Sequence, residues 1–233
     1  MKKILLALSI VLGLNTNAQT TIAGGAVYGT WTLAGSPYII QSSVVVPNDS
    51  TLTIQPGVVV SFQGHYKILA LGRILAMGNP TDSIYFTTTN TSIGWYGVRF
   101  DNTTANNDTS KFFYCSMQYG IANGSSGSDP YGGAFMFNNF SKAVVSNCLL
   151  KNNTVNAIYC TNASPVIINN TISYNSGGGI YILNTSNPYI AGNKVSYNNG
   201  AGIWGGTNLT IYNNVITHNN VCGHFCRQWY HFV

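Results

Sequence analysis

Residues 169–176 read NNTISYNS, and near-copies of this stretch flank it on both sides: SNCLLKNN (146–153), GNKVSYNN (192–199) and NNVITHNN (213–220). The leading asparagines of the four copies step by 23, 23 and 21 residues and are Asn147, Asn170, Asn193 and Asn214. A fixed period of this length is typical of a solenoid, in which one structural unit stacks on the next. The period therefore decides the fold before any other feature of the chain is considered.

Each repeat contains three short β segments. In the copy that begins at Pro165, the predicted strands 166–168, 171–173 and 179–182 are separated by Asn, Gly and Pro turns, and no helical period is present. Side chains along a strand alternate between its two faces, so the repeats predict columns of inward residues. The three predicted columns are Val144, Ile167, Ile190 and Ile211; Leu149, Ile172, Val195 and Ile216; and Phe135, Ile158, Ile180 and Ile203.

Three inward columns on three strands per turn predict an all-β fold, a right-handed parallel β-helix with turns of about 22 residues. The four leading asparagines fit a structural role, because asparagine tolerates left-handed turn geometry and stacks into amide ladders. In the first half, segments 44–46, 52–54, 58–62, 68–71, 74–76 and 84–86 are strand candidates. Segment 94–100 (GWYGVRF) matches the third strand, which places Val98 in the column of Phe135.

The ends of the chain predict its organisation. Lys2 and Lys3, an apolar run over 4–14 and the small residues before position 19 are typical of a secretory signal peptide cut after Ala18. Residues 19–220 are then the β-helix domain, irregular to about residue 132 and regular over 133–220. Residues 221–233 lose the repeat, which fits a truncated or frameshifted product or an improvised cap. We expect a secreted or outer-surface protein, or a periplasmic one, with no transmembrane segment.

The amino-acid composition limits the kinds of partner and cofactor that the protein is expected to bind. Only 6% of the residues are charged, and the net charge of +5 falls to about +3 once Lys2 and Lys3 are removed. The remaining basic residues are scattered, which argues against nucleic acid as a partner. Cys115, Cys148 and Cys160 lie within repeats and are interpreted as structural, whereas Cys222 and Cys226 in the tail could pair. No spacing of cysteine or histidine indicates a metal, and no cofactor is expected.

Two segments carry a resemblance to a known family. PGVVVSFQGHYKILALGRILAMGNPTDSIYFT (56–87) and GWYGVRF (94–100), followed by the asparagine-rich turns, resemble secreted parallel β-helix repeat proteins of the pectin-lyase-like superfamily, of the kind common in Bacteroidetes. The resemblance implies export and a β-helix, without implying an activity. Enzymes of that superfamily cleave polysaccharides: the lyases use a basic residue as the base, and the hydrolases need two facing carboxyl groups.

Catalytic candidates are few because the chain has five aspartates and no glutamate. Asp49 and Asp82 lie in turn sequences, and Asp108 and Asp129 lie in polar stretches. Asp101, at the end of the third strand and close to Arg99, is the best acidic candidate, and these two residues are the only weak catalytic candidates. No second carboxylate recurs at turn spacing, which favours a non-catalytic protein.

The residues that follow the third inward column predict an outward stripe. Its members are Arg99, Met136, Tyr159, Tyr181 and Trp204. Aromatic rings with a polar atom are good partners for sugars, so Arg99, Tyr159, Tyr181 and Trp204 are the predicted carbohydrate-binding residues. The alternatives are a purely structural ladder, or burial beneath an insertion at 123–133.

Two classes of function follow. The favoured one is an exported, non-catalytic β-helix module that binds a polysaccharide or cell-surface glycan or serves as an adhesin or scaffold. The other is a polysaccharide lyase or glycoside hydrolase, or a fragment of one.

Overall fold

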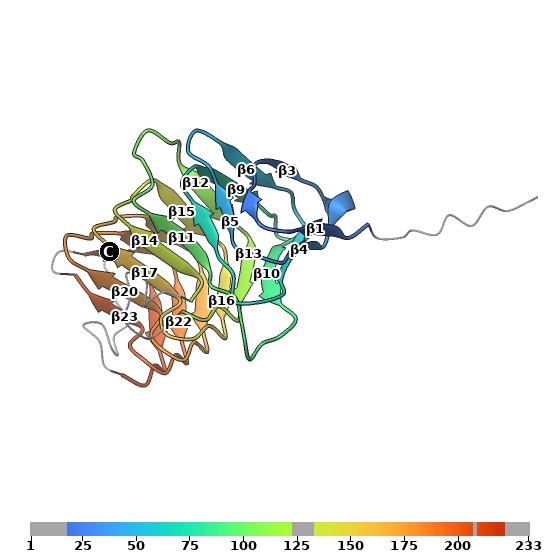
Figure 1. The fold of residues 1–233 in the computed structure, drawn as a ribbon. Coiled ribbons are helices and arrows are strands. Elements are labelled where there is room, and N and C mark those ends of the chain that lie inside the picture. Colours follow the sequence, from blue (N-terminus) through green and yellow to red (C-terminus); the bar gives the residue numbers. More distant parts are fainter. Residues whose placement is uncertain (1–17, 123–132, 207–208, 222–233) are drawn as a thin grey trace, which may run out of the picture.

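The computed structural model describes residues 18–122, 133–206 and 209–221 of the 233-residue chain. Its strands form three parallel sheets, which we name A, B and C, and the chain visits them in the repeating order A, B, C (Figure 1). One short 3-10 helix, η1 (Leu33–Gly35), lies near the N-terminal end. The predicted all-β, parallel β-helix fold is therefore confirmed.

The strands of each sheet are consecutive turns of one solenoid. Sheet A contains β1 (Thr20–Ile22), β4 (Tyr38–Ile40), β7 (Val59–Phe62), β10 (Ile84–Thr88), β13 (Cys115–Gln118), β16 (Leu149–Lys151), β19 (Thr171–Ser173), β22 (Lys194–Ser196) and β25 (Val215–Thr217). Sheet B contains β2 (Gly25–Ala26), β5 (Val44–Val46), β8 (Ile68–Ala70), β11 (Val98–Asp101), β14 (Phe135–Asn138), β17 (Ile158–Thr161), β20 (Ile180–Leu183) and β23 (Ile203–Gly205). Sheet C contains β3 (Gly29–Trp31), β6 (Thr51–Ile54), β9 (Arg73–Met77), β12 (Ser110–Phe113), β15 (Ala143–Ser146), β18 (Val166–Ile168), β21 (Tyr189–Ala191) and β24 (Thr210–Tyr212).

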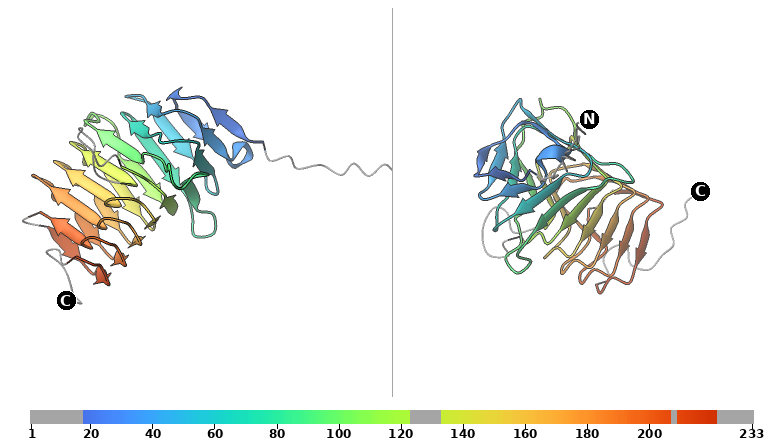
Figure 2. Two further views of the ribbon diagram at one scale, coloured as in Figure 1. Left: turned by 60° about the horizontal axis from the view of Figure 1, so that its bottom comes forward. Right: turned by 90° about the vertical axis from the view of Figure 1, so that its right-hand side faces the viewer.

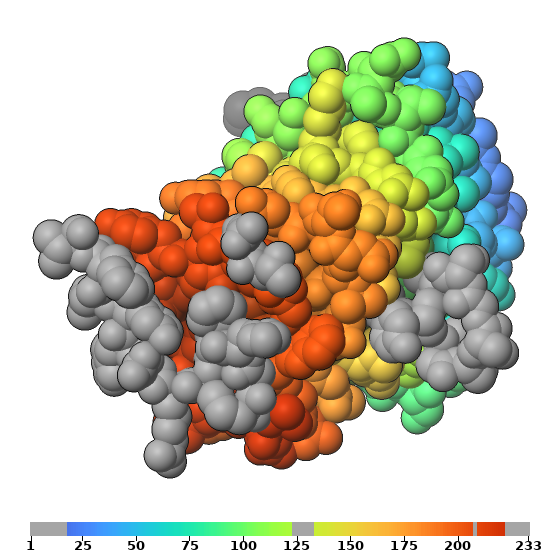
Figure 3. All heavy atoms as spheres, turned by 90° about the vertical axis from the view of Figure 1, so that its left-hand side faces the viewer, coloured from blue at the N-terminus to red at the C-terminus, as the bar shows by residue number. Residues whose placement is uncertain are grey.

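The turns stack along one axis, with the first and last described turns at opposite ends (Figure 2). On the surface, residues close in sequence form successive bands from one end to the other (Figure 3). Each turn therefore contacts chiefly the turns before and after it, which is the behaviour expected of a solenoid. The hydrophobic core runs the length of the stack inside the three sheets.

One of the three predicted inward columns is confirmed in full, and each of the other two is wrong at one residue. In sheet B, Val98, Phe135, Ile158, Ile180 and Ile203 are in register and buried, as predicted. In sheet C, the partner of Ile167 is Val145, and in sheet A the partner of Ile172 is Leu150. The predicted members Val144 and Leu149 are wrong by one residue and are only half-buried. The step from Val145 to Ile167 is one residue shorter than the step from Ile167 to Ile190. Val144 and Leu149 are each followed by a second apolar residue, Val145 and Leu150, which fits the column equally well.

From β11 onward, the chain bends at each corner through a residue with a left-handed backbone. After the sheet B strands this residue is Asn102, Asn139, Asn162 and Asn184. After the sheet C strands it is Tyr114, Asn147, Asn169, Gly192 and Asn213. After the sheet A strands it is Tyr119, Asn152, Tyr174, Tyr197 and His218. Asparagine and glycine are the residues that adopt this conformation at least cost, so their use at the first two corners, with Tyr114 as the exception, is expected.

Two buried amide ladders follow these corners. At the corner between sheets C and A, the backbone N–H of Asn170 donates to Asn193 Oδ1 and that of Asn193 to Asn214 Oδ1, both at 2.9 Å. The prediction of a ladder is confirmed for these three residues. It is wrong for Asn147, which is exposed and occupies the left-handed corner position. Cys148 takes the ladder position in that turn, because its N–H donates to Asn170 Oδ1 at 2.9 Å.

The second ladder lies at the corner between sheets A and B and is made of Asn153, Asn175, Asn198 and Asn219. Their side chains are joined by Nδ2 to Oδ1 hydrogen bonds of 2.8–2.9 Å. Each amide also donates to a backbone carbonyl of the previous turn, as Asn175 does to Leu150. The ladders thus satisfy polar groups that the tight corners bury.

The six strand candidates between residues 44 and 86 all occur, with boundaries shifted by at most two residues, whereas the strand in segment 94–100 is β11 and begins only at Val98. The four strands between residues 20 and 40 were not predicted, because their sequence shows no repeat. In the part of the chain that the structure describes, no helix has the length and apolar character needed to cross a membrane. The predicted signal peptide (1–17 of its 18 residues), Asp129, most of the 123–133 insertion and the tail with Cys222 and Cys226 lie outside the described residues.

Candidate functional site

The predicted outward stripe exists as a column on the outer face of sheet B. Arg99 pairs with Met136, Met136 with Tyr159, Tyr159 with Tyr181, and Tyr181 with Trp204, one residue per turn. The alternation of side chains along each strand places these residues opposite the buried sheet B column. The register predicted from the repeat is therefore confirmed for all five residues.

The three aromatic members form a continuous stack, which we name the sheet B ladder: Tyr159, Tyr181 and Trp204. The rings of Tyr159 and Tyr181 lie 5.9 Å apart at 15°, and those of Tyr181 and Trp204 lie 4.5 Å apart at 8°. Neighbouring rings in this stack cover one another's faces. Tyrosine and tryptophan also carry hydrogen-bonding groups, the phenol hydroxyl and the indole N–H.

Exposure increases along the stripe from Arg99 to Trp204. Arg99 is fully buried, Met136 and Tyr159 are 2% and 8% exposed, Tyr181 is half-buried, and Trp204 is 37% exposed. The expectation that the whole stripe faces solvent is thus wrong for its first three members. Only Tyr181 and Trp204 are placed to meet a ligand directly.

Arg99 lies within a cluster of basic and aromatic side chains. Its guanidinium carbon is 4.5 Å from the centre of the Tyr96 ring, and Lys67 Nζ is 5.6 Å from the same centre. The His65 ring lies 4.7 Å from that of Tyr96, and His65 Nε2 donates to the carbonyl of Ile121 at 2.5 Å. These contacts explain how an arginine is accommodated beneath the surface, since a ring face attracts a cation.

Asp101 is held by amides. Its Oδ1 accepts hydrogen bonds from Asn138 Nδ2 at 2.7 Å and from Asn102 Nδ2 at 2.9 Å. Arg99 and Asp101 are alternate residues of β11, so both lie on the outer face of sheet B. Arg99 is fully buried whereas Asp101 is half-buried, so the guanidinium of Arg99 is not placed to meet a polymer directly.

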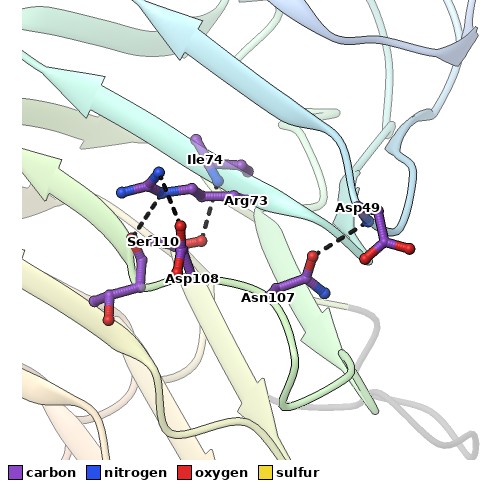
Figure 4. Close-up of polar contacts among 7 residues, drawn as sticks. Asp49, Arg73, Ile74, Asn107, Asp108 and Ser110 are labelled. Atoms are coloured by element: carbon purple, nitrogen blue, oxygen red, sulfur yellow. Dashed lines mark hydrogen bonds and ion pairs between the residues drawn. The ribbon is translucent and has the colours of Figure 1, made fainter.

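The other described carboxylates are dispersed over turns. Asp108 forms a 3.5 Å ion pair with Arg73, and its side chain is 79% exposed. The N–H of Asp49 donates to Asn107 Oδ1 at 3.3 Å, and Asn107 lies between Asp49 and Asp108 (Figure 4). Asp82 accepts from the hydroxyl of Thr81 at 2.7 Å. Among the described residues, none of these carboxylates shares a hydrogen bond with another.

The three described cysteines are buried and are not paired in disulfides. Burial raises the pKa of the Cys160 thiol, and burial together with a hydrogen bond to Cys148 raises that of Cys115. Such thiols are poor nucleophiles at neutral pH. Among the described residues, no group of three His, Cys, Asp or Glu side chains is placed to hold a metal ion.

Sequence reasoning missed the residues around Arg99. His65 and Lys67 come from the turn before β8, and Tyr96 comes from the segment before β11. The only signal in the sequence is the pairing of QGHYK (63–67) with GWYG (94–97) about one long turn later. That pairing does not reveal which side chains lie over the outer face of the sheet.

Comparison with known proteins agrees with this architecture. The family model of the right-handed β-helix region matches residues 96–232, more than half of the chain. The protein therefore belongs to the right-handed β-helix family. Searches of curated proteins and of solved structures found no match.

Proposed function

We propose that this protein is an exported, non-catalytic β-helix module that binds a polysaccharide or cell-surface glycan through the sheet B ladder. The single observation that carries the proposal is the stack of Tyr181 on Trp204, with Trp204 37% exposed on the outer face of the sheet. A soluble protein that keeps large rings at its surface in a regular array commonly uses them for binding.

The chemistry of the ladder suits a sugar polymer. Its rings recur once per turn, at centroid distances of 4.5–5.9 Å, so a polymer of sugar units lying along the axis meets the same kind of group repeatedly. Tyrosine and tryptophan combine apolar surface with a polar atom, which matches the mixed apolar and hydroxyl surface of a sugar. The dispersed carboxylates and the burial of Arg99 favour binding over cleavage.

Binding can be tested with purified protein on a glycan array, followed by calorimetry on the best ligand. We expect the variant Tyr181→Ala plus Trp204→Ala to bind at least tenfold more weakly, a loss of about 1.4 kcal/mol. Tyr85→Ala is the matched control, because Tyr85 is 44% exposed but lies on sheet A. Unchanged binding by the double variant would exclude the sheet B ladder as the binding surface.

The alternative, a polysaccharide lyase or glycoside hydrolase, is tested on the same preparation. Uronic-acid polysaccharides are incubated with the protein, and unsaturated products and new reducing ends are measured. Turnover that Arg99→Ala or Asp101→Asn abolishes would replace the binding module with an enzyme. We expect no turnover above that of a heat-inactivated sample.

A further inference from the structure

We propose that a second aromatic stack, at the corner between sheets A and B, is a further contact surface for a neutral polysaccharide. We name it the corner ladder, and it consists of Tyr174, Tyr197 and His218. This inference rests on the proposed function, because it assigns a second surface and a ligand class to the same binding activity.

The corner ladder is regular and exposed. The rings of Tyr174 and Tyr197 lie 5.3 Å apart at 5°, and those of Tyr197 and His218 lie 4.8 Å apart at 13°. Tyr174 is 59% exposed and Tyr197 48%, more than any member of the sheet B ladder. The stack therefore presents a continuous row of ring edges over three consecutive turns.

The backbone beneath these rings is in a conformation that aromatic residues avoid. Tyr174, Tyr197 and His218 have φ of 55°, 57° and 54°. A side chain with a Cβ adopts this left-handed region at a cost in free energy, and strain of this kind concentrates at functional sites. Aromatic rings are thus retained at a position where asparagine would fold more easily.

The other two corners supply the comparison within the same turns. Over residues 133–206 and 209–221, every left-handed residue after a sheet B strand or a sheet C strand is asparagine or glycine. At the corner between sheets A and B, asparagine occurs once, at Asn152, in the turn before the ladder begins. Asparagine, which adopts this conformation at a lower cost in free energy, therefore occurs at this corner in one turn. The next three turns have tyrosine or histidine there instead.

The groups around the corner ladder indicate a neutral, hydroxyl-rich ligand. Two residues after each ring comes an exposed polar side chain: Ser176, Asn199 and Asn220. Asn220 Nδ2 donates to Asn199 Oδ1 at 2.7 Å, so these amides also run along the axis. The sequence from residue 133 onward contains no Asp or Glu and few Lys or Arg. Apart from Lys151, which precedes Asn152, and His218 itself, these groups are hydroxyls, amides and ring edges, which match a neutral polysaccharide better than a charged polymer.

The two ladders occupy the same turns. Tyr174 precedes Tyr181 by seven residues (181 − 174), and Tyr197 precedes Trp204 by seven (204 − 197). Each of these turns thus contributes one ring to the corner and one to the outer face of sheet B. A polymer that lies along the axis is offered two parallel rows of contacts.

The test uses the full-length protein and affinity gel electrophoresis with xyloglucan, galactomannan and hydroxyethylcellulose, with polygalacturonate as the charged comparison. The main variant is Tyr174→Asn plus Tyr197→Asn, which removes both rings and relieves the backbone strain. A second variant, Tyr174→Phe plus Tyr197→Phe, keeps the stack and removes the hydroxyls. The control is Tyr189→Asn plus Tyr212→Asn, since these tyrosines are each 43% exposed on sheet C.

We expect the asparagine variant to bind a neutral polysaccharide about tenfold more weakly, the phenylalanine variant to be weakened at unchanged thermal midpoint, and the control to match the wild type. Wild-type affinity in the asparagine variant, with loss of binding in Tyr181→Ala plus Trp204→Ala, overturns the corner ladder and leaves the proposed function standing. Tighter binding of polygalacturonate than of every neutral polymer overturns the ligand class. Absence of wild-type binding to every neutral polymer overturns the corner ladder's ligand class, and absence of signal on the glycan array as well overturns the proposed function.

Discussion

At the corner between sheets C and A, the thiol of Cys148 occupies the position that Asn170, Asn193 and Asn214 occupy in the next three turns. The N–H of Cys115 donates to Cys148 Sγ at 3.3 Å, as the N–H of Cys148 itself donates to Asn170 Oδ1 at 2.9 Å. A sulfur atom thus continues a row of amide oxygens toward the N-terminal turns. The hydrogen-bond pattern of the corner is independent of the residue that supplies the acceptor.

Asn193→Ala removes the centre of this ladder. Asn193 Nδ2 donates to the Ile167 carbonyl, and Asn193 Oδ1 accepts from the N–H of Asn170, both at 2.9 Å. An unpaired buried group costs about 1–3 kcal/mol, so we expect the free energy of unfolding to fall by about 2–4 kcal/mol. Chemical denaturation measures the change. Asn187→Ala, at an exposed asparagine one corner away, should change it by less than about 0.5 kcal/mol.

The buried thiols make stability depend on alkaline pH. An unfolded thiol ionises at about pH 8.5, whereas burial keeps the folded Cys160 protonated to a higher pH. Above about pH 8.5 the unfolded state therefore holds fewer protons than the folded state, and the free energy of unfolding falls as pH rises. Below that pH the contribution is complete.

Cys160→Ala isolates this effect. Urea denaturation at a series of pH values from 7 to 10 should give a shallower decline for the variant, with a difference of up to about 1.4 kcal/mol per pH unit. Identical slopes for the variant and the wild type would mean that Cys160 ionises as readily in the folded protein as in the unfolded chain.

Gly177→Ala tests how closely the turns approach one another. A methyl group at Gly177 would overlap the backbone carbonyl of Val155 in the preceding turn, which cannot rotate away. We expect a loss of about 1–3 kcal/mol in the free energy of unfolding, the usual range for an overpacked site. Ser176→Ala, at the neighbouring exposed position, is the control and should leave the thermal midpoint unchanged.

Asn107 should matter more to stability than the ion pair beside it. Asn107 is 6% exposed, and its Nδ2 donates to the Leu71 carbonyl at 2.8 Å and to Asn48 Oδ1 at 3.0 Å. Asn107→Ala should cost about 2 kcal/mol, because it leaves buried groups unpaired. Asp108→Asn should cost less than about 1 kcal/mol, since its pair with Arg73 is exposed. Denaturation that ranks the two variants in the opposite order would contradict this account.

The repeat allowed the fold and the register of sheet B to be predicted from sequence, because Ile158, Ile180 and Ile203 each stand beside glycine or alanine and admit one alignment. The repeat predicted the inward positions at Val144 and Leu149 one residue too early, because the following apolar residue fits the column as well and this turn is one residue shorter than the next. The N-terminal strands lack repeated side chains, so no period revealed them.

The candidate site was predictable in part. Tyr159, Tyr181 and Trp204 were placed in one column by alternation alone, and the structure agrees. The burial of Arg99 depends on Tyr96, which belongs to an irregular segment that no pattern places. The corner ladder was missed because tyrosine in a turn is ordinarily exposed and unordered, and a left-handed backbone under it is not foreseeable from propensity.

The equivalence of Asn170 and Asn193 means that the molecule's length is adjustable in whole units. Excision of residues 170–192 would join Asn169 to Asn193 and give the remaining corner the same sequence of backbone conformations and hydrogen-bond acceptors. The product would be one strand spacing shorter, about 4.8 Å, with an unchanged cross-section. Duplication of the same segment would lengthen it by the same step. The length of such a β-helix can therefore change through duplication or deletion of the DNA that encodes one turn, while the contacts within each remaining turn stay the same.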